Sequence, residues 1–175
     1  MPELAKPIQD FVLHWGEMGA RWGVNRTVAQ IHALLMVSEH PLPADEIAES
    51  LQVARSNVST SLKELQSWGL VKSQHVLGDR RDHFQSEKDV WDMFLIVMDE
   101  RKRREIDPTI ATLQQCMEEM SDAAAPDAYA KTQIGNLMSF METTDDWYQN
   151  FRKLPKPMMV RFFKLGGRLR RLLGD

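Results

Sequence analysis

The stretch from Pro43 to Gly69 concentrates short polar side chains on one expected helix. Apolar residues recur there at spacings of four and three (Val58, Leu62, Leu65), which predicts a helix from about 55 to 68 with one buried stripe. The remaining positions would expose hydroxyl, amide and basic groups, namely Arg55, Ser56, Asn57, Ser59, Thr60, Ser61 and Lys63. Such groups approach a base edge closely and hydrogen-bond to it. The alternative is a core helix with a polar outside, although a solvated face usually carries more Glu, Lys and Gln.

A shorter helix is expected just before this one, from about 44 to 51. Its residues Ile47, Ala48 and Leu51 fall on one face, and Asp45 and Glu46 lie in its first turn, where acidic groups favour the helix dipole. The link 52–54 has the three-residue length expected between the helices of a helix-turn-helix. The two helices therefore predict that motif, with the second helix as its recognition element.

A β-hairpin is expected directly after the second helix. Residues 70–76 alternate well enough for a strand, 77–82 form a polar turn, and 83–85 return as a second strand. Two arginines, Arg80 and Arg81, lie at the tip of this hairpin. A helix-turn-helix followed at once by such a hairpin is a winged helix, so a second contact to DNA is expected from the wing.

These features resemble the MarR superfamily of bacterial and archaeal regulators over roughly residues 10 to 115. Asp79-Arg80-Arg81 matches the Asp-x-Arg wing motif of that family, in which the arginine enters the minor groove and the aspartate orients it. The likeness is to the GbsR-type branch, and it rests on the segments 22–26 (WGVNR), 55–59 (RSNVS), 69–71 (GLV) and 87–91 (EKDVW).

The resemblance implies a homodimeric DNA-binding transcriptional regulator that acts on a pseudo-palindromic operator. It assigns the minor-groove contact to Arg81, with Asp79 orienting it and Arg80 as the competitor for the same role. A second function remains open, that of a winged-helix module that binds protein and not DNA.

The charge distribution keeps that second function open. The net charge is −3, and residues 26–88 hold seven Lys/Arg against eight Asp/Glu. Residues 89–151 hold five against thirteen, and residues 152–175 hold eight against one. A nearly neutral winged helix must place its basic groups on one face to contact phosphates, since local placement matters more than the total.

Composition argues against several other classes of protein. Apolar residues make up 43% of the 175 residues, no apolar run is long enough to span a bilayer, and no secretory signal opens the chain. The single cysteine, Cys116, suits a reducing cytoplasm. The hydroxyl groups have no histidine base nearby, so no enzyme is expected. His32 and His40 have no third ligand nearby, so no metal site is expected, and no cofactor is expected either.

The expected fold is mainly α with a small β-hairpin wing, in three parts: an N-terminal helix within 1–25, the winged helix-turn-helix at 26–88, and a helical dimerisation region at 89–175. Within the last part we expect one long helix over 89–120, with a bend at Pro108, a link at 121–126, a helix over 127–151 and a basic amphipathic helix over 155–173. The apolar stripes of the terminal segments 4–19 and 155–173 predict dimer contacts or packing within the chain, in preference to a membrane surface.

Five aromatic residues lie in the segments expected at the junction of the DNA-binding and dimerisation parts: Trp15, Trp22, Trp91, Trp147 and Tyr148. An aromatic cage would suit a quaternary ammonium ion through cation–π attraction. The resemblance implies the same class of effector, since members of the GbsR-type branch regulate glycine-betaine synthesis or uptake and can sense choline. The simpler alternative is that these rings are core residues.

Overall fold

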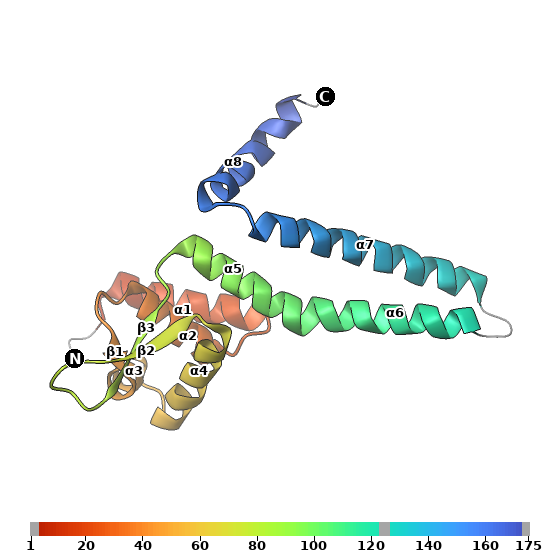
Figure 1. Ribbon diagram of the computed structural model, residues 1–175. Coiled ribbons are helices and arrows are strands. Elements are labelled where there is room, and N and C mark those ends of the chain that lie inside the picture. The colour runs from red at the N-terminus through yellow and green to blue at the C-terminus, as the bar shows by residue number, and fades with distance from the viewer. Residues whose placement is uncertain (1–3, 123–126, 173–175) are drawn as a thin grey trace. The chain divides into compact units, whose positions relative to one another are not determined.

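The computed structural model describes residues 4–122 and 127–172, and over these it is mainly helical with one three-stranded antiparallel sheet (Figure 1). The predicted fold class, mainly α with a β-hairpin wing, is confirmed. The chain divides into two compact units, an N-terminal unit of residues 1–97 and a C-terminal unit of residues 98–175. No helix within the described ranges is long and apolar enough to cross a bilayer.

The N-terminal unit begins with two closely packed helices, α1 (Lys6–Arg21) and α2 (Arg26–Val37). A Cβ added at Gly19 would lie 2.5 Å from the Cβ of Ala29, so the two helices approach each other at a position where only glycine fits. The apolar stripe of α1 is used within the chain, because Val12 is buried and Phe11 packs against the same core.

The helix-turn-helix is formed by α3 (Ala44–Leu51) and α4 (Arg55–Trp68), close to the predicted bounds. Gln52 turns the chain between them in the left-handed region, with φ of 52°, and the N–H of Val53 donates to the carbonyl of Ala48 at 3.1 Å. Side chains from these helices and from α2 form a dry core that fixes the orientation of α4; its fully buried members include Ile31, Leu34, Ile47, Val58, Leu62 and Leu65.

The wing is the hairpin of β2 (Val71–His75) and β3 (Asp82–Ser86), paired from Val71↔Ser86 to His75↔Asp82. A third strand, β1 (Leu42–Pro43), pairs with β3 and places the sheet order at β1-β3-β2. The local sequence does not indicate strand β1, because the strand with which it pairs lies far along the chain. The pairing anchors the base of the wing beside the start of α3.

Helix α5 (Val90–Arg101) spans the division between the units, and a π-helical segment, Lys102–Ile106, follows it. The C-terminal unit continues with α6 (Asp107–Asp122), α7 (Ala128–Arg152) and α8 (Lys156–Leu172). The chain stays helical through Pro108, where a bend was predicted, and the irregular π-helical stretch ends two residues before that proline. Helix α6 extends into the predicted link, whose residues 123–126, like residue 173 of the predicted last helix, lie outside the described ranges.

In the C-terminal unit, α6 and α7 run side by side (Figure 1). Tyr148 of α7 donates a hydrogen bond to Asp99 Oδ1 at 2.8 Å, and burial together with this bond raises the pKa of the Tyr148 phenol. Lys102 of the π-helical segment forms ion pairs with Asp107 and with Asp145, the latter at 2.9 Å. The contacts of Tyr148 and Asp145 fix α7 against the end of α5 and the π-helical segment.

Candidate nucleic-acid interface

Helix α4 presents a row of exposed polar side chains. Ser56, Ser59, Thr60 and Lys63 are exposed, and their spacings of three, four and seven put them on one side of the helix. Asn57 and Arg55 are also exposed beside this row, in the first turn. The core holds the opposite side through Val58, Leu62 and Leu65, which leaves the polar side open to an external ligand.

One predicted member of this surface, Ser61, is misplaced. Ser61 is only 5% exposed, so the expectation that it lies on the exposed polar side of the helix is wrong. Ser61 follows Val58 by three positions and precedes Leu65 by four, and it therefore belongs to the buried stripe. The helical spacing already contained this information, but the polar residue type pointed the other way.

The first turn of α4 has the electrostatic character of an anion site. It contains no acidic residue, and no side chain in the described ranges caps it at Ala54. The first N–H groups of a helix have no intrahelical partner and carry the positive end of the dipole, which suits a phosphate. Arg55 adds a full positive charge at the same place.

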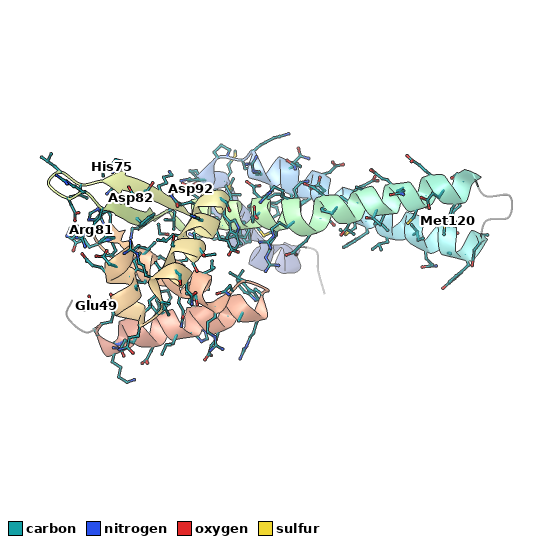
Figure 2. The ribbon with its side chains drawn as sticks, turned by 90° about the horizontal axis from the view of Figure 1, so that it is seen from below. Glu49, His75, Arg81, Asp82, Asp92 and Met120 are labelled. Carbon is teal, nitrogen blue, oxygen red and sulfur yellow. The ribbon has the colours of Figure 1, made fainter. Side chains whose placement is uncertain are left out.

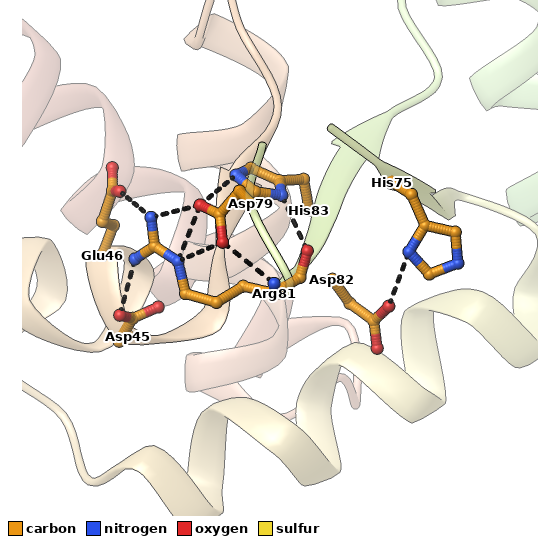
Figure 3. A network of polar contacts seen from close by, with 7 residues as sticks. All are labelled: Asp45, Glu46, His75, Asp79, Arg81, Asp82 and His83. Atoms are coloured by element: carbon orange, nitrogen blue, oxygen red, sulfur yellow. Dashed lines mark hydrogen bonds and ion pairs between the residues drawn. The ribbon is translucent and has the colours of Figure 1, made fainter. Parts of the chain in front are cut away.

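At the wing, the carboxylate of Asp79 lies beside the guanidinium of Arg81 and binds it (Figure 3). Asp79 Oδ1 accepts the backbone N–H of Arg81 at 2.9 Å, and Oδ2 accepts Nε at 2.9 Å and Nη2 at 2.6 Å. The hydrogen bonds from the Arg81 side chain and backbone lower the pKa of Asp79 to about 2. The aspartate therefore stays ionised and fixes the direction of the guanidinium.

The other edge of the Arg81 guanidinium faces two acidic residues at the start of α3. Nη1 donates to Asp45 Oδ2 at 2.8 Å, and Nη2 lies 3.5 Å from Glu46 Oε1. The hydrogen bond from Arg81 lowers the pKa of Asp45. Sequence reasoning interpreted both acids only through the helix dipole, because no local signal connects α3 with a wing residue 36 positions later.

Two histidines complete the wing. His83 is buried beneath the loop, with Nδ1 3.0 Å from the carbonyl oxygen of Arg81 and Nε2 3.5 Å from Asp79 Oδ2. Across the hairpin, Nδ1 of His75 lies 3.5 Å from Oδ1 of Asp82. Figure 2 shows both residues at this end of the sheet, together with Arg81. Arg80 is exposed. The two wing arginines thus differ: Arg81 is bound to carboxylates, and Arg80 extends into solvent.

Lys88 ties the segment after the wing to the end of α2. Its Nζ donates to the carbonyl oxygens of Leu35 at 2.7 Å, Met36 at 3.0 Å and Ser38 at 2.7 Å. Burial lowers the pKa of this amine. A cation at a helix C-terminus satisfies carbonyls that have no intrahelical partner. Sequence reasoning missed this contact, which joins residues about fifty positions apart.

The five aromatic residues expected around an effector have different surroundings. In the N-terminal unit, Trp15 packs against Phe11 and His32. In the same unit, Trp91 packs against Phe94, whereas Trp22 is 57% exposed. In the C-terminal unit, Tyr148 is buried, whereas Trp147 is 49% exposed and stacks on Phe151. Trp15 and Tyr148 are therefore engaged in packing, and Trp22 and Trp147 present ring surface to solvent.

Comparisons with known proteins agree with this architecture. The MarR family matches residues 22–82, which include the helix-turn-helix and the wing arginines. The HTH-type transcriptional repressor GbsR of Bacillus subtilis (strain 168) is 22% identical over 142 residues, covering 79% of this chain and 78% of GbsR. A crystal structure of a transcriptional regulator aligns with a TM-score of 0.66 at 18% identity, over 90% of this chain and 99% of that one. The structural likeness supports the fold alone. Residues 22–82 therefore carry the likeness to the MarR family, and over most of its length the chain is similar to the transcriptional repressor GbsR.

Proposed function

We propose that this protein is a DNA-binding transcriptional regulator that acts as a homodimer in the cytoplasm. The observation that carries this proposal is the exposed face of α4, a row of short polar side chains with Arg55 at its start and Lys63 further along. A helix with this surface fits the major groove, where short side chains reach base edges and basic residues reach phosphates. Arg80 and Arg81 on the wing supply a second contact in the same unit.

Within the α4 face we assign Ser56, Asn57 and Thr60 to base edges. An asparagine side chain matches the donor and acceptor pattern of adenine in the major groove. Lys63 and Ser59 contact phosphate or sugar, and Arg55 lies where it reaches either a base or the backbone. Ser61 is excluded from this surface because it is buried.

The wing contact is assigned to Arg81, oriented by Asp79, in the minor groove. Arginine is favoured there because a narrow A·T-rich groove concentrates negative potential. Arg80 is the competing candidate, and its exposure supports a contact to phosphate. For Arg81 to extend into the groove, its guanidinium must release its ion pairs with Asp45 and Glu46 and contact the DNA in their place.

The dimer is proposed because each chain carries one helix-turn-helix, and reading both halves of a pseudo-palindrome takes two. A two-fold symmetric protein reads a pseudo-palindrome whose half-sites are centred about 34 Å apart, one turn of the duplex. The regulator is further proposed to respond to a quaternary ammonium compound. The exposed rings of Trp22 and Trp147 support this, because a cation needs an accessible aromatic face.

A binding assay at two salt concentrations tests the DNA proposal. Fluorescence anisotropy with duplex DNA that flanks the gene should show affinity falling steeply between about 50 and 200 mM salt, as counterion release requires. Lys63→Gln should reduce the slope of log K against log salt by about 1, since one phosphate contact is lost. Lys6→Gln, which removes the same charge from α1, should leave the slope unchanged. Absence of binding to any duplex at low salt would overturn the proposal in favour of a protein partner.

A further inference from the structure

The turn at the tip of the wing carries an exposed leucine. Leu77 is 104% exposed, as much as in an extended peptide, and its neighbour Val76 is 39% exposed. The N–H of Asp79 donates to the carbonyl of Val76 at 3.0 Å, and φ is positive at Gly78 (86°) but not at Leu77. Residues 76–79 therefore form a type II turn with Leu77 at its first corner. Hairpin turns mostly use Gly, Pro, Asn, Asp or Ser, so the leucine is an unusual choice there.

The residues around Leu77 give the wing tip a positive charge next to this apolar group. Arg80 is exposed, and the side chain of Arg81 is 45% exposed. The carboxylate of Asp79 already accepts hydrogen bonds from Nε and Nη2 of Arg81, at 2.9 and 2.6 Å. An apolar side chain beside two cations suits a groove of DNA, because its rims carry phosphates and its walls are the C–H groups of deoxyribose.

We propose that Leu77 enters the minor groove together with Arg81 and selects there against guanine. The proposal rests on the DNA binding of the proposed function. It assigns base selectivity to a residue outside the recognition helix and outside the Asp-x-Arg motif. Leu77 and Arg81 lie in the same loop, 76–81, between the two strands of the wing. A loop that brings the arginine to the groove therefore brings the leucine with it, and burial against the sugars favours an apolar side chain.

The selectivity follows from the hydrogen-bonding groups on the floor of the groove. An A·T pair presents only acceptors there, and the Arg81 guanidinium supplies donors for them. A G·C pair adds the amino group of guanine, which is a donor and projects from the floor. The side chains of Leu77 and Arg81 contain no acceptor, and Asp79 is engaged by Arg81. Guanine would thus bury a donor without a partner, which is costly.

This amino group can be added to the minor groove while the major groove stays the same. The base 2,6-diaminopurine pairs with thymine, keeps the major-groove pattern of adenine and carries the minor-groove amino group of guanine. The contacts of α4 are therefore equal on two forms of the duplex that flanks the gene, one with adenine and one with 2,6-diaminopurine. Fluorescence anisotropy at constant salt should show the unmodified chain binding the second form about tenfold more weakly, the typical cost of one poor base pair.

Leu77→Ser tests whether the leucine causes this penalty. The hydroxyl of serine accepts a hydrogen bond from the added amino group, so the penalty should fall from about tenfold to about threefold. Leu13→Ser is the matched control, because Leu13 of α1 is a leucine that is 56% exposed and lies outside the wing. It should keep the full penalty. Circular dichroism should show the same spectrum for both variants, as each replaces an exposed side chain.

The outcomes separate this proposal from the proposed function. Equal binding of the two duplexes by the unmodified chain would overturn the selection against guanine. An equal penalty in Leu77→Ser and the unmodified chain would also overturn it, and would assign the penalty to Arg81 or to the width of the groove. In both cases the DNA is still bound, so the proposed function stands. Absence of binding to either duplex at low salt would instead overturn the proposed function, and this proposal with it.

Discussion

The guanidinium of Arg81 on the wing and the carboxylate of Asp45 at the start of α3 lie 2.8 Å apart, although 36 positions separate them in the chain (Figure 3). Asp79 holds the same guanidinium from its other edge. The Arg81 side chain is 45% exposed, and so is that of Asp45. In the absence of DNA, α3 therefore competes for the group that we assign to the minor groove.

Asp45→Asn should strengthen binding to operator DNA. The substitution removes the closer competing carboxylate and leaves Asp79 to orient Arg81. An exposed ion pair of this kind contributes little, so the expected gain is about two- to fivefold in affinity. Anisotropy titration at constant salt measures it. The gain should vanish in the double variant Asp45→Asn/Arg81→Ala, because it depends on the released guanidinium.

A general charge effect is excluded by Glu49→Gln, which removes one negative charge from the same helix. Equal gains from Glu49→Gln and Asp45→Asn would show that the affinity responds to net charge alone. Arg81→Ala by itself should cost affinity, most of all on A·T-rich flanks, where the groove is narrow. Normal binding of Arg81→Ala to such flanks would remove the wing from the interface.

Asn57→Ala should relax the preference for particular base pairs. Loss of a paired hydrogen bond to a base typically costs about 1–3 kcal/mol at that position and little elsewhere. Binding to an operator library, compared before and after the substitution, measures this change. Ser61→Ala is the internal control, because its buried hydroxyl lies away from the exposed face and should leave base preference unchanged. Uniform weakening of all sequences by Asn57→Ala would reassign Asn57 to the phosphate backbone.

His32 should make the protein sensitive to acid. The residue is 6% exposed, its Nε2 has no hydrogen-bond partner in the described ranges, and burial lowers its pKa from 6.5 to about 4. Because the unfolded chain binds this proton more readily, the free energy of unfolding is insensitive to pH above about 6.5 and falls as the pH drops toward 4. Between pH 7 and pH 5 the loss from this one group is about 2 kcal/mol.

Urea unfolding of His32→Leu at the two pH values measures this effect. The variant should lose less stability between pH 7 and pH 5 than the unmodified protein, because it has no imidazole to charge. The exposed histidine His14 provides the comparison, and His14→Leu should keep the full pH dependence. An identical pH dependence in all three proteins would contradict the assignment to His32.

Choline or glycine betaine should bind with measurable heat if the exposed aromatic rings serve an effector. Each well-placed ring contributes about 0.5–2 kcal/mol to the binding of a quaternary ammonium ion. Calorimetry with the unmodified chain, Trp22→Leu and Trp147→Leu locates the ring that is used, and DNA titration with and without ligand measures the coupling. With no heat and no change in DNA affinity, all five aromatics would be packing residues.

The sequence by itself determined the elements that depend on local periodicity. The bounds of α3 and α4, the hairpin of the wing and the polar face of α4 follow from apolar spacing and turn residues, because these act over a few neighbouring positions. The helical spacing also indicated that Ser61 is buried, because it lies between Val58 and Leu65 on the apolar stripe. This was missed because the polar residue type was given more weight.

Contacts between distant segments were decided by the tertiary structure alone. Strand β1 exists because Leu42 pairs with Phe84, and this pairing brings Asp45 to Arg81. The three carbonyls around Lys88 likewise depend on how whole elements pack. A short sequence window carries no information on which remote backbone or side chain will meet a given group. That choice is made by the packing of the core, which fixes all of these elements at once.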